Sequence, residues 1–221
     1  MASRSKNEGI VHEILRDESF SPEGIKEALW KRNVSFVKAY DRYYNMLFIP
    51  LAILWLLPAV AKYSNWAFLS FFAELPRIDF PSIAVVLAVV LFPIGICLEA
   101  IVCLERTRHG GCHDFHESVV VVRQGPYRII RHPGYLAEII YFAMLPIILS
   151  RWVPYTIFAG VGTILVVASL SYLIRREDDF NVKKWGEEYG RYMKEVPAIN
   201  FVRGLWNLKQ SKEYESGKEV D

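Results

Sequence analysis

The stretch that decides the fold is Gly125-Pro126-Tyr127-Arg128-Ile129-Ile130-Arg131-His132-Pro133-Gly134-Tyr135, which stands directly before a long apolar run. Proline fixes its own backbone angle and biases the residue before it toward extended backbone. Gly125-Pro126 therefore predicts a turn with Gly125 extended, and His132-Pro133 predicts a helix stop with a new helix beginning at Gly134. A rigid polar segment at the mouth of an apolar helix indicates a binding site. The alternative is an interfacial loop whose arginines and tyrosines contact lipid headgroups.

The composition indicates a membrane protein. Hydrophobic residues make up 52% of the 221 residues and aromatic residues 14%, and the apolar residues gather in runs. The net charge of +2 gives no reason to expect a nucleic-acid partner. Cys97 and Cys103 lie in an apolar run and Cys112 in a polar segment, which argues against a disulfide framework. The polar N-terminus lacks the apolar core of a signal peptide, so we expect no cleaved leader.

Four apolar segments predict the membrane spans, because a helix rises 1.5 Å per residue and the hydrocarbon core is roughly 30 Å thick. The predicted spans lie near 43–61, 80–104, 134–149 and 152–174. Only Ser150-Arg151 separates the last two, which predicts a helical hairpin. Residues 62–79 predict an interfacial loop or half-helix, which leaves room for a fifth pass. The predicted fold class is therefore an all-α, polytopic membrane bundle of four or five spans. The predicted membrane domain covers residues 43–202.

The two ends of the chain are polar. In residues 1–42, Ser21-Pro22-Glu23 predicts a helix start. The residues after it place apolar side chains near one face and lysine and arginine over much of the rest, which predicts an amphipathic basic helix. Such a helix could lie on an anionic membrane surface or dock on the rest of the protein. Residues 203–221 predict a polar tail that is disordered from Lys209 onward.

The cations predict an orientation in the membrane. Lysine and arginine are frequent before the first span, in residues 105–133 and after the last span, and sparse in the two other connections. By the positive-inside rule, the termini and the Gly125 stretch face the cytoplasm. Glu99 lies inside the second predicted span, where a carboxylate needs a partner or water. We expect it to reach water near the cytoplasmic end.

A second polar motif follows the last predicted span. Arg175-Arg176-Glu177-Asp178-Asp179-Phe180 places three acids together, and a short amphipathic helix follows from Glu187 to Tyr192 and ends near Val196-Pro197. The acids could bind an ammonium group, or they could form a solvated helix end, although acids are unfavourable at a helix C-terminus. In the first motif, the tyrosine rings could attract a cation such as a sulfonium, and the amides at the start of the next helix could bind a carboxylate.

Together the two motifs, G-P-Y-x-x-x-R-H-P-x-Y and E-D-x-F-x-x-x-x-W-G-x-E-Y-x-x-Y-x-x-x-V-P, resemble the isoprenylcysteine carboxyl methyltransferase family, whose general plan the phospholipid N-methyltransferases share. The resemblance covers about Phe115 to Pro197. It implies an integral membrane enzyme that uses S-adenosylmethionine, with a cytoplasmic cofactor pocket closed over by the C-terminal segment. The implied partners are membrane lipids and a lipid-like or prenylcysteine acceptor. The oligomeric state is left open.

The resemblance also implies roles for individual residues. Arg131 and Glu177 would be catalytic, and Tyr192 would help to cover the pocket. The implied cofactor-binding residues are Gly125, Tyr127, His132, Pro133, Tyr135, Glu177, Asp178 and Tyr189. The chain departs from the family pattern at Asp178, where glutamate is usual, and after Pro197, where a basic residue often follows.

The expected reaction is in-line displacement at an activated methyl group, for which the protein mainly aligns the reactants and excludes water. A carboxylate acceptor needs no general base, whereas an amine or thiol would need Glu177, Glu138 or His132 in that role. Two other functions remain open. One is an NADPH-dependent membrane reductase of the sterol type, although such reductases have more spans. The other is an inactive membrane scaffold.

The segment from His109 to His116 contains the residue types that bind metals. Its sequence, His109-Gly110-Gly111-Cys112-His113-Asp114-Phe115-His116, matches no zinc-ligand spacing with four well-presented ligands. We therefore expect no metal at this segment, and the paired glycines predict a turn.

Overall fold

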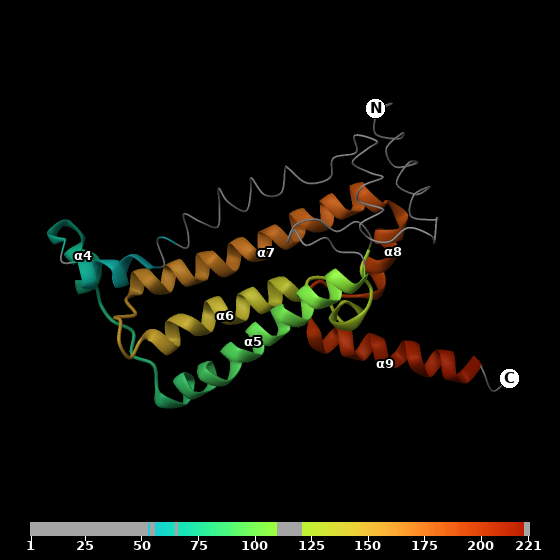
Figure 1. Ribbon diagram of the computed structural model, residues 1–221, viewed down its shortest axis with the longest axis horizontal. Coiled ribbons are helices and arrows are strands. Elements are labelled where there is room, and N and C mark those ends of the chain that lie inside the picture. Colours follow the sequence, from blue (N-terminus) through green and yellow to red (C-terminus); the bar gives the residue numbers. More distant parts are fainter. Residues whose placement is uncertain (1–52, 54–55, 65, 110–120, 219–221) are drawn as a thin grey trace, which may run out of the picture. The chain divides into compact units, whose positions relative to one another are not determined.

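The computed structural model describes residues 53, 56–64, 66–109 and 121–218, apart from the side chains of 183, 184 and 211–218. Its elements are η1 (Ala67–Leu69), α4 (Ser70–Glu74), α5 (Ser82–His109), η2 (Gly125–Arg128), α6 (Pro133–Leu149), α7 (Ile157–Trp185), α8 (Glu187–Glu195) and α9 (Phe201–Lys218) (Figure 1). Between these helices, the described residues contain an isolated antiparallel bridge that joins Arg77 to Thr156. The described chain is thus helical, as the sequence predicts.

Two helices, α5 and α7, are long and apolar enough to cross a membrane, by length and composition. The apolar helix α6 is shorter. Helices α5 and α6 contain Pro93 and Pro146, which membrane helices tolerate when neighbouring groups satisfy the freed carbonyls. Of the first predicted span, 43–61, residues 53 and 56–61 are described and are helical. The predicted N-terminal amphipathic helix lies outside the described residues.

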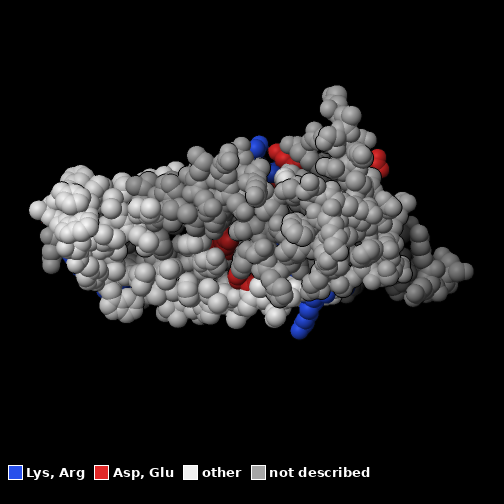
Figure 2. Space-filling view, turned by 45° about the horizontal axis from the view of Figure 1, so that its top comes forward, with Lys and Arg blue, Asp and Glu red and all other residues white. Residues whose placement is uncertain are grey.

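The described residues divide into two compact units, and the second of them is largely apolar. Among the described residues it comprises 53, 56–64, 66–99 and 134–175. Where Figure 2 draws described residues of this unit, most of the visible atoms belong to uncharged residues. Its exposed aliphatic residues on α5 are Ile83, Val86, Leu87, Val89, Val90, Leu91, Ile94 and Ile96. A surface of this kind is unusual for a soluble monomer and typical of a helix that contacts lipid.

Close packing in this unit occurs where α5 meets α6. A Cβ atom on Gly95 would lie 3.2 Å from the carbonyl oxygen of Ala137 and 3.1 Å from the side chain of Ile140. Glycine therefore lets the two helix backbones approach each other, as small residues commonly do between membrane helices. Glu99, one turn after Gly95, is half-buried.

The connection between α6 and α7 is longer than the sequence predicts. Residues 150–156 join the helices, whereas Ser150-Arg151 was expected to suffice. The reason is a pairing of extended segments: the Ile78 amide donates to the Tyr155 carbonyl at 2.8 Å, and the Ile157 amide donates to the Pro76 carbonyl at 3.0 Å. Residues 62–79, where an interfacial loop or half-helix was expected, contain η1 and α4. Their position at a membrane interface stays a prediction.

Other helix boundaries also differ from the prediction. Helix α6 begins at Pro133 rather than Gly134, because proline fits the first position of a helix. Helix α7 continues beyond residue 174 to Trp185, so the three acids lie inside the helix and not at its end. The prediction of disorder from Lys209 is wrong for residues 209–218, which are helical as the end of α9, and residues 219–221 lie outside the described part of the chain.

The first unit contains, among the described residues, 100–109, 121–133 and 176–218. Its core is a cluster of three buried aromatic residues, Trp185, Tyr189 and Tyr192, with Val121, Met193 and Val196 packed against it. The rings of Trp185 and Tyr189 stack with centroids 5.9 Å apart, and Tyr189 meets Tyr192 edge-on at 5.7 Å. This unit holds almost all the residues of the two motifs.

Candidate functional site

Asp178 is the centre of the first unit's polar contacts. Its Oδ2 atom accepts a hydrogen bond from Nη2 of Arg131 at 2.7 Å. Its Oδ1 atom lies 3.3 Å from Nε of Arg131, 2.8 Å from Nε2 of His132 and 2.8 Å from the Tyr189 hydroxyl. All four residues are buried. The forked contact with Arg131 and the two further donors stabilise the ionised form of the Asp178 carboxyl group.

The local sequence brings these donors together. Helix α7 carries Asp178, and α8 carries Tyr189 eleven residues later. Between the helices, Gly186 has φ +58°, a backbone conformation that glycine adopts without steric cost. The turn at Gly186 lets Tyr189 stack on Trp185 with its hydroxyl 2.8 Å from Oδ1 of Asp178.

Arg131 also holds the segment that follows α8. Its Nη1 atom donates to the carbonyls of Met193, at 3.1 Å, and Val196. Backbone pairing adds to this: the Arg131 amide donates to the Pro197 carbonyl at 2.9 Å, and the His132 amide donates to the Ala198 carbonyl at 3.0 Å. Each of the three guanidinium nitrogens of Arg131 therefore donates to a protein group. These bonds and the backbone pairing join the loop that carries Arg131 to the segment that follows α8.

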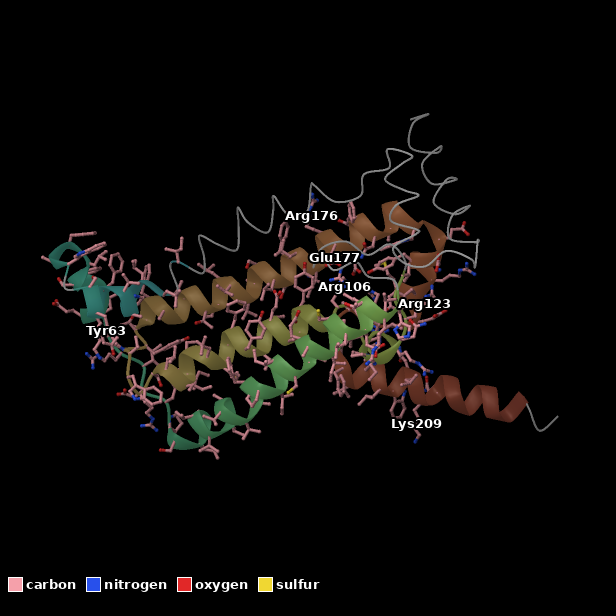
Figure 3. All side chains as sticks on the ribbon, viewed as in Figure 1. Tyr63, Arg106, Arg123, Arg176, Glu177 and Lys209 are labelled. Atoms are coloured by element: carbon pink, nitrogen blue, oxygen red, sulfur yellow. The ribbon has the colours of Figure 1, made fainter. Side chains whose placement is uncertain are left out.

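Glu177 is the accessible carboxylate of the site (Figure 3). Its Oε2 atom lies 3.7 Å from Nδ1 of His132, and its side chain is 32% exposed, against 11% for Asp178. His132 thus stands between two carboxylates, with Nε2 toward Asp178 and Nδ1 toward Glu177. A ligand that reached this site would meet Glu177, because the oxygens of Asp178 already accept protein donors.

Two buried tyrosines complete the site. The Tyr192 hydroxyl donates to the Tyr127 carbonyl at 2.7 Å, and the guanidinium of Arg123 lies over the Tyr192 ring at 5.2 Å. Burial, and then the charge of Asp178, raises the pKa of Tyr189 above its ordinary value of 10.0. Burial also raises the pKa of Tyr192. Both phenols therefore stay protonated and act as hydrogen-bond donors at neutral pH.

Gly125 differs from its predicted conformation. Its φ is +54°, in the left-handed region, and not extended as Pro126 would favour. A Cβ atom here would lie 2.8 Å from Cγ of Glu105 on α5. Glycine is thus required twice at the start of η2, once for the backbone angle and once for the space that Glu105 fills.

The structure brings together Arg131, His132, Glu177, Asp178 and Tyr189 of the predicted site. The same unit contains Gly125 and Tyr127 in η2, and the buried Pro133, which begins α6. Tyr135 is buried too, but it belongs to the second unit. The predicted contacts of these residues with a cofactor stay predictions.

Sequence reasoning did not single out Arg123 or Glu105. Arg123 donates to the Glu188 carbonyl at 3.1 Å as well as contacting Tyr192, so it joins the segment before η2 to α8. The sequence offered one indication that Arg123 belongs to the site, since it stands two residues before the Gly125-Pro126 turn. Glu105 had no comparable signal, because its contact with Gly125 depends on how the end of α5 packs.

Metal ligands were predicted to be absent from the segment between His109 and His116. Residues 110–116 lie outside the described part of the chain. His109 ends α5, and its Nδ1 atom lies 3.1 Å from a carboxylate oxygen of Glu105. In the described part of the chain, no group of three or more His, Cys, Asp or Glu residues could hold a metal ion.

Residues 26–196 match the model of a family described as a protein of unknown function, DUF1295. The chain belongs to the DUF1295 family. The matched region of this DUF1295 protein includes the first polar motif and the second as far as Val196, so the helix α9 lies beyond it. No curated protein and no solved structure matches the chain.

Proposed function

We propose that this DUF1295 protein is an integral membrane methyltransferase that uses S-adenosylmethionine and acts on a lipid-like or prenylcysteine carboxylate. The observation that carries the proposal is the joining of the two motifs through Asp178, which binds Arg131 and His132 of the first motif and Tyr189 of the second. These are the motifs on which the resemblance to the isoprenylcysteine carboxyl methyltransferases rests. Their residues meet in one unit, as a joint site requires.

The side chains fit the amino-acid end of such a cofactor. An ammonium group calls for an accessible carboxylate, and Glu177 supplies one next to the buried imidazole of His132. Asp178 would not bind the ligand directly, since its oxygens accept bonds from Arg131, His132 and Tyr189. It would instead be a positioning residue that fixes the two neighbours of Glu177. The ring of Tyr127, which is only half-buried, would be the one to meet a sulfonium, because the rings of Tyr189 and Tyr192 already pack against Trp185 and Arg123.

When bound, S-adenosylmethionine supplies a methyl group on a sulfonium, and its transfer to a carboxylate oxygen breaks the S–C bond with the electron pair remaining on sulfur. The protein's own part is positioning. Glu177 would hold the ammonium group, and Arg131 would keep the loop from Gly125 to His132 joined to the C-terminal segment. No side chain has to accept a proton when the acceptor is an ionised carboxylate. We place this site on the cytoplasmic side, because the flanking polar segments are rich in cations.

Ligand binding by the full chain in detergent tests the proposal. Thermal unfolding is measured with S-adenosylhomocysteine, with NADPH and with neither, since a ligand that binds only the folded state raises the melting temperature. We expect S-adenosylhomocysteine alone to stabilise the protein. Stabilisation by NADPH alone would assign a reductase, and no stabilisation by either ligand would favour a scaffold. Labelled cofactor with prenylcysteine, phospholipid and small-thiol acceptors then identifies the acceptor class.

A further inference from the structure

Helix α9 presents an exposed apolar surface. Val202 is 78% exposed and Trp206 is 64% exposed, and Phe201 and Leu205 are also exposed. At about 100° per residue these four side chains cover an arc of roughly 140° on one side of the helix. We call Phe201, Val202, Leu205 and Trp206 the apolar arc. Large aromatic and aliphatic side chains gathered in this way indicate a surface that contacts something other than water.

The other side of α9 is fixed to its own unit. A Cβ atom on Gly204 would lie 1.9 Å from the carbonyl oxygen of Ile129, so the helix backbone rests on the loop that leads to Arg131. The Asn207 side chain donates to the Glu195 carbonyl at 2.9 Å. The Asn200 side chain caps the helix by accepting from the Arg203 amide at 3.0 Å. The apolar arc therefore faces away from the unit on which α9 is packed.

The charges near the apolar arc are positive. Residues 201–210 contain Arg203 and Lys209 and no acidic residue, and α9 as a whole has four basic residues against two acidic ones, Glu213 and Glu215. Lys209 extends from α9 in Figure 3. Tryptophan with flanking lysine and arginine is the composition of helices that lie at the surface of an anionic membrane.

The end of a potential membrane helix lies in the same unit. Ile101 and Leu104, near the C-terminus of α5, are exposed, as are the aliphatic residues earlier in that helix. The unit that carries the apolar arc thus already includes a surface suited to lipid. A second copy of the chain is a poorer occupant, because a symmetric contact would bring Arg203 and Lys209 close to the same cations of the other copy.

We propose that α9 lies in the headgroup region of an anionic bilayer, with the apolar arc directed into the lipid. Because Gly204 rests on Ile129 and Asn207 binds Glu195, the helix would hold the loop before Arg131 and the end of α8 at the membrane surface. The proposal does not depend on the reaction that the site performs.

Spin labels test the position of α9. Single cysteines replace Val202, Trp206 and, as the control, Arg203, which is exposed and lies about 160° around the helix from Leu205, in a full-length chain whose three native cysteines are serine. The protein is placed in nanodiscs of phosphatidylcholine with phosphatidylglycerol. We expect the labels at positions 202 and 206 to collide with oxygen more often than with a water-soluble nickel chelate, and the label at position 203 to show the reverse. Equal access of the nickel chelate to all three labels would overturn the proposal, and so would spin–spin broadening at position 202, which would indicate a second copy.

Fluorescence provides a second measurement that does not need the labels. Brominated lipids quench tryptophan within the bilayer, and the contribution of Trp206 is the difference between the parent and Trp206→Phe. We expect quenching of this contribution to be at least as strong in discs with phosphatidylglycerol as in discs of phosphatidylcholine alone. A Trp206 contribution that brominated lipids leave unquenched in both kinds of disc would contradict a position at the membrane surface.

Discussion

Nε2 of His132 lies 2.8 Å from Oδ1 of Asp178, while Nδ1 of the same ring lies 3.7 Å from Oε2 of Glu177. One buried imidazole therefore contacts two carboxylates that are adjacent in the sequence but differ in their surroundings. Asp178 is enclosed by protein donors, whereas Glu177 is partly exposed. This difference assigns the two acids different parts: Asp178 maintains the fold of the unit, and Glu177 is available to a ligand.

Asp178→Asn should destabilise the protein strongly. The substitution leaves the buried guanidinium of Arg131 without its opposite charge, and removing one partner of a buried pair costs about 3–5 kcal/mol. The measurement is thermal unfolding of the full chain in detergent. Asp179→Asn is the matched control, because Asp179 is the next residue on α7 and is exposed. Its effect should stay within about 0.5 kcal/mol. Equal melting temperatures for the two variants would refute the central place of Asp178.

Glu177→Gln should separate binding from stability. Its contact with His132 is partly exposed, so the loss in stability should be at most about 1 kcal/mol. The affinity for S-adenosylhomocysteine, measured by calorimetry, should fall about 10- to 100-fold, because a hydrogen bond to a charged group contributes about 1.5–3 kcal/mol. Glu187→Gln, at an exposed position on α8, should bind like the parent. If Glu177→Gln also binds like the parent, Glu177 does not hold the ligand.

Alkaline pH should destabilise the first unit. The folded state raises the pKa of Tyr189 and of Tyr192 above 10.0, so it retains their protons where the unfolded chain releases them. The corresponding stability is fully present below pH 10 and is lost as the pH rises toward the folded pKa values. Unfolding followed by denaturant at several pH values measures this slope. A Tyr189→Phe, Tyr192→Phe double variant should be less stable at neutral pH and should show a shallower alkaline slope.

Two helical glycines should respond differently to alanine. At Gly204 the added methyl group would overlap the Ile129 carbonyl, so Gly204→Ala should displace α9 and lower the melting temperature. At Gly190 nothing lies within 4 Å of the added carbon, and alanine favours the helix α8 by about 0.5–1 kcal/mol. Gly190→Ala should therefore be neutral or stabilising. Protease sensitivity after residue 200 gives an independent measure of the displacement of α9, and unchanged cleavage in Gly204→Ala would contradict the close packing.

The sequence predicts α5 and α7 as long apolar helices, because hydrophobic length alone indicates them. The first of the four predicted spans lies mostly outside the described residues. It also predicts that the segment around Arg131 and the segment around Asp178 share a unit, because their motifs belong to one recognisable pattern. It does not predict which carboxylate is enclosed. Glu177 and Asp178 have the same chemistry and adjacent numbers, and their roles depend on which face of α7 meets His132.

Other features depend on packing that leaves no local mark. Pro126 favours extended backbone at Gly125, but η2 begins at Gly125 with a positive φ, and the side chain of Glu105 fills the space that a Cβ would need. The polar composition after Lys209 predicts disorder, yet α9 forms on the cap from Asn200 and on contacts made by Gly204 and Asn207. The start of α7 moves to Ile157 because Tyr155 pairs with Ile78.

The contacts of Arg131 have a consequence for the synthesis of the chain. Its side-chain partners follow it by 47, 62 and 65 residues. The ribosome therefore releases Arg131 before Asp178, Met193 and Val196 exist, and the guanidinium stays unpaired until α7 and α8 have been made. A chain interrupted before Asp178 would therefore contain this cation without any of these three partners.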